Sequence, residues 1–114
     1  MTVTPEIQQI TDIIRQTVPA ERIYLFGSHA YGTPHEHSDY DFYVVIPDGS
    51  MRPLDAMDKV HWEVAQTSMK KPIDVMASYA SRFHERKKFN TLERKIERDG
   101  VLLHERTRHR DAVA

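Results

Sequence analysis

Two aspartates spaced two residues apart are the clearest sign of chemistry in this sequence. Asp39 and Asp41 stand in an alternating segment, so on a strand both carboxylates project from one face, roughly 7 Å apart at the backbone. Carboxylates at that spacing can converge on one hard cation, and magnesium prefers such oxygen ligands. We therefore expect Asp39 and Asp41 to bind Mg²⁺.

Asp74 is the candidate for a third metal ligand. Sites that hold two ions about 4 Å apart generally require a third carboxylate. Asp74 lies in an otherwise apolar segment, where a buried unpaired charge would be costly, and its neighbours Ile73 and Val75 point the opposite way. Such sites serve phosphoryl-group transfer, because the metal orients a polyphosphate and neutralises charge as pyrophosphate leaves. The three aspartates thus predict a catalytic two-metal site, in which no spacing identifies the general base.

A glycine–serine pair upstream of these aspartates predicts a nucleotide-binding turn. Gly27 follows a short apolar run, where a glycine lets the backbone turn and approach phosphate oxygens closely. Ser28 offers a hydroxyl and an amide to the same phosphates. A short helix beginning at Ser28 or Ala30 would point its N-terminus at the anion, and Gly32 is expected to close the turn.

The elements that position these residues follow from hydrophobic periodicity. Strands are expected at residues 22–26, 39–46, 72–77 and 101–103. In the second of these, one face carries Asp39, Asp41, Tyr43 and Val45, and the other carries Tyr40, Phe42, Val44 and Ile46.

Three longer helices are expected between and around the strands. The first begins at Thr4–Pro5, and its apolar side consists of Ile7, Ile10, Ile14 and Val18. The second has an apolar side of Leu54, Met57, Val60, His61 and Val64. The last has an apolar side of Phe89, Leu92 and Ile96 and ends at Gly100. Trp62, Met57 and Met69 are interpreted as core or interface residues, and His61 as a hydrogen-bonded or partner-facing residue. The element order predicts an α/β (α+β) fold, with a small mixed sheet of three to four strands flanked by helices.

Composition bounds the class of protein. With 114 residues, 39% apolar and 29% charged, the chain predicts one domain over residues 1–104 and a flexible polar tail over 105–114. It has no cysteine, no apolar run long enough to span a bilayer and no secretory signal pattern, so we expect a cytoplasmic protein without a membrane partner. The pair His35 and His37 beside Glu36 is interpreted as plain loop rather than as a zinc site.

Charge is unevenly distributed along the chain. The net charge of −1 argues against nucleic acid as a partner. Residues 1–81 nevertheless carry 6 basic and 11 acidic side chains, whereas residues 82–114 carry 10 basic and 6 acidic ones. The basic third could meet an acidic partner or a polyphosphate, although a solvated helix face with ion pairs is the simpler interpretation.

The spacing of these motifs resembles the signature of the DNA polymerase beta superfamily of nucleotidyltransferases, in which Gly-Ser is followed after ten residues by Asp-x-Asp. Gly27-Ser28 and Asp39-Tyr40-Asp41 match it without a gap, and residues 20–104 resemble the minimal nucleotidyltransferase (MNT) group. The resemblance implies a nucleotidyltransferase fold with ATP as substrate. It also implies that Asp39, Asp41 and Asp74 bind the catalytic metals, and that Gly27 and Ser28 hold the triphosphate.

One segment departs from the family pattern. Where the family usually has Arg-Ala-Arg-Gly after Gly-Ser, this chain has His29-Ala30-Tyr31-Gly32. Neutral histidine and tyrosine cannot reproduce the bidentate contact that arginine makes with phosphate.

Three functions follow as hypotheses. The resemblance implies the antitoxin of a HEPN/MNT toxin–antitoxin pair, which transfers AMP from ATP to a tyrosine of a helical HEPN-type ribonuclease toxin. The loss of the loop arginines favours instead a non-catalytic subunit that neutralises a helical partner by contact. The third is a nucleotidyltransferase that acts on a small molecule or an RNA 3′ end through a homo-oligomeric pocket.

Overall fold

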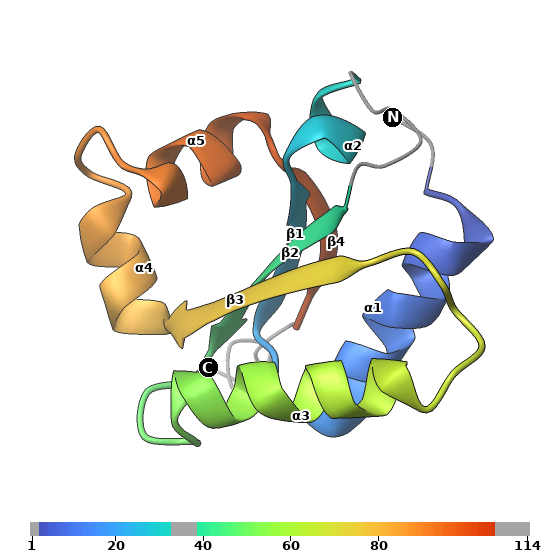
Figure 1. The fold of residues 1–114 in the computed structure, drawn as a ribbon. Coiled ribbons are helices and arrows are strands. Elements are labelled where there is room, and N and C mark those ends of the chain that lie inside the picture. Colours follow the sequence, from blue (N-terminus) through green and yellow to red (C-terminus); the bar gives the residue numbers. More distant parts are fainter. Residues whose placement is uncertain (1–2, 33–38, 107–114) are drawn as a thin grey trace.

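A four-stranded mixed sheet forms the centre of the protein, seen in a computed structural model that describes residues 3–32 and 39–106 (Figure 1). Its strands are β1 (Arg22–Phe26), β2 (Tyr40–Ile46), β3 (Ile73–Tyr79) and β4 (Val101–Glu105), in the spatial order β3-β2-β1-β4. β1 pairs antiparallel with both β2 and β4, whereas β2 and β3 run parallel. The predicted mixed sheet is confirmed.

The strand ends differ slightly from those predicted. β2 begins at Tyr40, so Asp39 lies just before the strand, and β3 continues two residues past Ala77. β4 runs through Glu105, and the Arg106 N–H donates to the Glu21 carbonyl at 2.8 Å. The expected tail therefore does not begin at residue 105, while residues 107–114 lie outside the described part of the chain, as does the loop that contains His35 and His37.

Five helices flank the sheet in the described residues: α1 (Pro5–Thr17), α2 (Ser28–Tyr31), α3 (Pro53–Ala65), α4 (Ala80–Arg86) and α5 (Leu92–Asp99). The start of α1 is confirmed, since the Thr4 Oγ1 accepts a hydrogen bond from the Ile7 N–H at 3.2 Å. Within the described residues, no helix is long and apolar enough to cross a bilayer.

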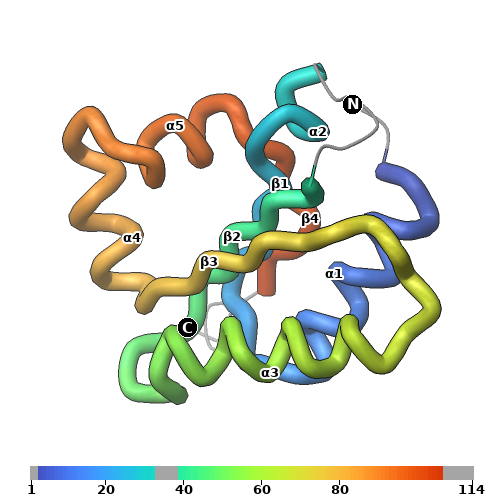
Figure 2. The backbone as a smooth tube through the Cα atoms, in the orientation of Figure 1, coloured from blue at the N-terminus to red at the C-terminus, as the bar shows by residue number. Residues whose placement is uncertain are grey.

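The helices cover both faces of the sheet, as the ribbon and the tube show (Figures 1 and 2). α1 and α3 pack on one face, where the larger core gathers around Phe42, Val44 and Ile46. α4 and α5 pack on the other face, where a smaller core gathers around Tyr43 and Phe83. The predicted alternation along β2 is thus confirmed, because odd-numbered and even-numbered residues enter different cores.

The apolar side of α3 was partly mispredicted. Its buried residues are Ala56, Val60 and Val64, whereas Leu54 is 68% exposed and His61 is also exposed. The buried stripe follows i, i+4 spacing through the small Ala56, and neighbours one residue away on a helix point elsewhere. Trp62, at 68% exposure, is likewise not a core residue, while Met57 and Met69 do pack against the core.

The last helix, predicted from Phe89, Leu92 and Ile96, begins only at Leu92, and an additional helix, α4, precedes it. Phe89 is 60% exposed and lies in the connection between α4 and α5. Thr91 begins α5 as its N-cap, with its Oγ1 accepting from the Arg94 N–H at 3.3 Å. The helix α4 gives little apolar signal in the sequence, because its buried residues are Ala80 and Phe83 and its end is charged.

Candidate functional site

Asp41 and Asp74 lie directly opposite each other on neighbouring parallel strands. The register of β2 and β3 pairs these two residues, and adjacent strands stand about 4.8 Å apart. Val75 is buried in the larger core, so Asp74 points to the opposite face, where it is exposed. Asp39, also exposed, immediately precedes β2. The tertiary structure therefore joins two of the three predicted metal ligands across a strand pair.

The backbone of Gly27 lies directly against the Asp41 carboxylate. Gly27 follows β1 with a φ of +78°, and its neighbour Phe26 is the register partner of Asp41. A Cβ atom on Gly27 would stand only 2.1 Å from Asp41 Oδ2. The glycine is therefore required both by its positive φ and by the carboxylate that lies against it.

The predicted short helix after Gly27 is present as α2. Ser28 is its first residue, and the N–H groups of Ala30 and Tyr31 donate to the Gly27 carbonyl at 3.0 and 3.1 Å. Gly32 ends the helix in the left-handed conformation, with a φ of +82°, as expected for the residue that closes this turn. Ser28 is thus placed next to the glycine that contacts Asp41.

Negative charge is crowded at Asp41. Its pKa is raised, first by burial and then by the negative charges of Asp74 and Asp39, while His29 opposes the shift. Carboxylates that repel one another in this way form a donor set that a bound cation would stabilise. Within the described residues, no group of three or more histidine, aspartate or glutamate side chains is already gathered around one ion position. Metal binding by the three aspartates therefore stays a prediction.

The two residues that replace the loop arginines make aromatic contacts. The His29 ring lies 4.5 Å from the Tyr40 ring, centroid to centroid. The Tyr31 ring lies under the ammonium group of Lys95, with Nζ 4.9 Å from the ring centroid. Lys95 belongs to α5. Sequence reasoning did not predict this contact, and the only related feature was the general excess of basic residues after position 81.

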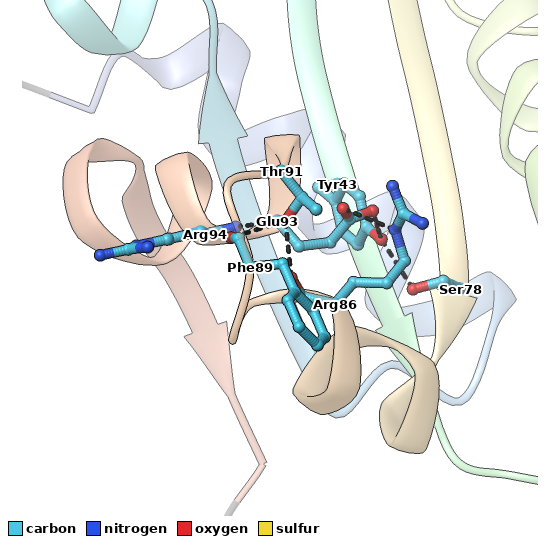
Figure 3. Close-up of polar contacts among 7 residues, drawn as sticks. All are labelled: Tyr43, Ser78, Arg86, Phe89, Thr91, Glu93 and Arg94. Carbon is cyan, nitrogen blue, oxygen red and sulfur yellow. Dashed lines mark hydrogen bonds and ion pairs between the residues drawn. The ribbon is translucent and has the colours of Figure 1, made fainter.

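A buried polar network joins α4 and α5 to the face of the sheet on which the smaller core lies (Figure 3). The Tyr43 hydroxyl donates to Glu93 Oε2 at 2.8 Å and lies 2.7 Å from Ser78 Oγ. The Arg86 Nε–H donates to Glu93 Oε1 at 2.9 Å. Since Tyr43 has one proton, which goes to the carboxylate, the Ser78 hydroxyl is the donor to Tyr43.

Glu93 is the central acceptor of this network and is only 6% exposed. Burial raises its pKa, but the hydrogen bonds from Tyr43 and Arg86 outweigh burial and leave the pKa below the ordinary value. Sequence reasoning missed Glu93, because a glutamate in a strongly charged helix has the pattern of a surface residue.

The family model of the polymerase beta nucleotidyltransferase domain matches residues 8–109. The chain belongs to the polymerase beta nucleotidyltransferase family. The family resemblance inferred from the glycine–serine turn and the aspartate pair is confirmed, and so is the nucleotidyltransferase fold.

A curated relative of this nucleotidyltransferase domain is the protein adenylyltransferase MntA from Shewanella oneidensis. The two are 37% identical over 60 residues, which are 51% of this chain. The chain spans only 38% of the relative's length in this match. The relationship is therefore distant and partial.

Three solved structures share the nucleotidyltransferase fold. A toxin–antitoxin with AMP-PNP matches with a TM-score of 0.58 at 21% identity, over 96% of this chain and 80% of the other. A mutant MntA–HpeT toxin–antitoxin matches with a TM-score of 0.61 at 20% identity, over 92% and 77%. A protein from Sulfolobus solfataricus, assigned as a nucleotidyltransferase, matches with a TM-score of 0.58 at 23% identity, over 87% and 77%. At these identities the matches show the fold.

Proposed function

We propose that this nucleotidyltransferase domain transfers AMP from ATP to a protein partner, at a tyrosine of a HEPN-type ribonuclease toxin, and so acts as an antitoxin. The observation that carries the proposal is the placement of Asp41 opposite Asp74, with the Gly27 backbone against the Asp41 carboxylate. This arrangement sets a phosphate-binding turn beside a carboxylate pair, which are the two components that nucleotidyl transfer requires.

The site residues divide the binding and the chemistry of the proposed reaction, with Asp74 a candidate for both. Gly27 and Ser28 hold the triphosphate, while Asp39, Asp41 and Asp74 hold magnesium. Bound magnesium would orient the triphosphate and neutralise the charge that develops on the leaving group. The acceptor hydroxyl oxygen forms a bond to the α-phosphorus, and the bond from that phosphorus to the bridging oxygen of pyrophosphate breaks. Pyrophosphate leaves with the electron pair, and the exposed Asp74 is the candidate base for the hydroxyl proton.

The acceptor class rests on the relatives. The Shewanella relative is a protein adenylyltransferase, and two of the proteins with this fold are toxin–antitoxin structures. One of these structures contains AMP-PNP, an analogue of ATP. These relatives support ATP as the donor and a toxin protein as the acceptor.

The test incubates the chain with Mg²⁺, α-labelled ATP and the protein encoded beside it. A double variant, Asp39→Ala with Asp41→Ala, is compared with a control, Asp55→Ala with Asp58→Ala, on α3 at the opposite face of the sheet. We expect label on the neighbouring protein with wild type and control, and none with the site variant. Label that persists in the site variant contradicts the proposal.

A second function, neutralisation of a partner by contact alone, is favoured by the replacement of the loop arginines with His29 and Tyr31. It predicts tight binding of the neighbouring protein without any label, and unchanged binding by the aspartate double variant. Label on a small molecule or an RNA in the absence of the neighbour would instead support a different acceptor class.

A further inference from the structure

The short helix α2 supplies little positive charge to a bound triphosphate. Its only basic residue is His29, whereas the polyphosphate carries several negative charges into a site that already contains three aspartates. Phosphoryl-transfer sites balance this charge with lysine or arginine as well as with metal. A cation for the β- and γ-phosphates must therefore come from another element of the fold.

α5 brings such a cation next to α2. In the ribbon and tube views the C-terminal end of α5 runs toward α2 (Figures 1 and 2). The contact between the two helices is made by Lys95, whose Nζ lies 4.9 Å from the centre of the Tyr31 ring. An ammonium over an aromatic face is attracted by the ring, and its N–H donors that point away from the ring can bind other acceptors. Lys95 is thus held over a residue of the nucleotide-binding turn without losing its charge.

The Tyr31 hydroxyl group also points to a ligand at this position. Its Oη is buried, and its O–H finds no acceptor among the residues that the structure describes. Burial raises the pKa of Tyr31, and the negative charges of Asp99 and Asp41 add to the rise. The Gly27 backbone N–H, which points a hydrogen bond at Oη, and the positive charge of Arg98 lower this pKa. The Tyr31 hydroxyl is therefore influenced both by Gly27 and Asp41 and by the charged residues at the end of α5. A buried hydroxyl without an acceptor is costly, and a ligand that accepts its hydrogen bond removes that cost.

We propose that Tyr31 and Lys95 together bind the β- and γ-phosphates of the nucleoside triphosphate. An arginine supplies hydrogen-bond donors and a positive charge from one guanidinium group. In this chain the two roles are divided, because the Tyr31 hydroxyl donates a hydrogen bond and the Lys95 ammonium supplies the charge. The inference rests on the nucleotide site of the proposed function, but not on the identity of its acceptor.

The other basic residues of α5 are less suited to this role. Arg98 is engaged by the adjacent Asp99, with its Nη2 3.0 Å from Oδ2. Arg94 and Arg98 line a separate hollow with Lys87 and Glu97, whose own charges pair at 2.8 Å. Among the described residues, Lys95 is the α5 cation that lies over the Tyr31 ring, whereas Arg98 acts on Tyr31 only through its charge.

The test measures binding rather than transfer. Isothermal titration with Mg²⁺ gives the Kd of the non-cleavable analogue α,β-methylene-ATP and of AMP for the wild-type chain, Lys95→Met and Tyr31→Phe. Lys59→Met, an exposed lysine on α3, is the matched control. We expect each site variant to bind the triphosphate about 10-fold more weakly, as for the loss of one charge-assisted contact, with AMP affinity unchanged. The control keeps both affinities.

A rescue variant strengthens the test. Tyr31→Arg in the Lys95→Met background should regain most of the triphosphate affinity, because one guanidinium again supplies donors and charge. Equal losses for triphosphate and AMP, unchanged triphosphate binding in Lys95→Met, or no triphosphate binding by wild type would each overturn the assignment.

The outcomes separate this inference from the proposed function. Selective loss of triphosphate affinity, with no label on the neighbouring protein, supports the Tyr31–Lys95 pair and removes the adenylyltransferase proposal. Transfer that persists with unchanged triphosphate affinity in Lys95→Met removes the pair and keeps that proposal.

Discussion

The backbone of Gly27 lies against the carboxylate of Asp41, with no room for a side chain between them. A Cβ atom at Gly27 would stand 2.1 Å from Asp41 Oδ2, a distance that no non-bonded pair of atoms tolerates. The position of the Asp41 carboxylate therefore depends on the glycine at the end of β1. Any side chain at position 27 must displace Asp41.

Gly27→Ala is expected to abolish nucleotidyl transfer and to lower the free energy of unfolding by about 1–3 kcal/mol, because it adds a steric overlap to an unfavourable positive φ. The measurements are label transfer and urea unfolding. Gly49→Ala is the matched control, since Gly49 has a φ of +76° but nothing within 4 Å of an added Cβ. Equal behaviour of the two variants would show that the contact with Asp41 is unimportant.

Asp41→Asn is expected to raise the thermal midpoint in the absence of Mg²⁺, by about 2–5 °C, while it abolishes transfer. It removes one of three mutually repelling carboxylates from a partly buried position. Thermal unfolding followed by circular dichroism checks this, with Asp58→Asn on the exposed surface of α3 as the control. A midpoint below that of the wild type would mean that the charge of Asp41 stabilises the fold.

Magnesium is expected to raise the thermal midpoint of the wild-type chain, because a ligand that binds only the folded state stabilises it. The same unfolding experiment with and without Mg²⁺ checks this for wild type and Asp41→Asn. The variant should show a smaller rise, since it lacks one of the proposed ligands. Equal rises in both would place the responsible cation elsewhere on the protein.

Tyr43→Phe is expected to lower the free energy of unfolding by about 1–3 kcal/mol, because it removes one of the two described side-chain donors to the buried Glu93 carboxylate. Urea unfolding at neutral pH is the measurement. Tyr79→Phe, at the end of β3 and outside this network, serves as the control. A loss no larger than in the control would show that the Tyr43 hydroxyl contributes little to stability.

The stability that Glu93 contributes is expected to disappear in acid. Its pKa is lower in the folded protein than its ordinary value of 4.5, so the unfolded chain binds a proton more readily. This contribution is complete above pH 4.5 and is lost as the pH falls through the folded-state pKa. Urea unfolding of wild type and Glu93→Gln should therefore give a difference that shrinks below pH 4.5. A constant difference would contradict the assignment.

Some sequence-based predictions of the fold succeeded because they depended on local properties. The alternation in residues 40–46 places Phe42 and Tyr43 in different cores, since successive side chains of a strand point to opposite faces. The helix α4 was not predicted, and α5 was expected to begin before Leu92. Phe89 matches the helical spacing of Leu92 and Ile96, yet packing leaves it exposed, and the Thr91 cap decides where α5 begins.

The sequence by itself determined the glycine–serine turn, the aspartate pair and the family, because these depend on spacing within one short segment. Only the tertiary structure decided that Asp74 lies opposite Asp41, that Glu93 is buried beneath Tyr43 and that Lys95 covers Tyr31. The physical reason is that each of these pairs joins segments far apart in the chain. The strand register and the side-chain contacts that bring each pair together depend on how the helices pack against both faces of the sheet. The periodicity of a single segment does not specify that packing.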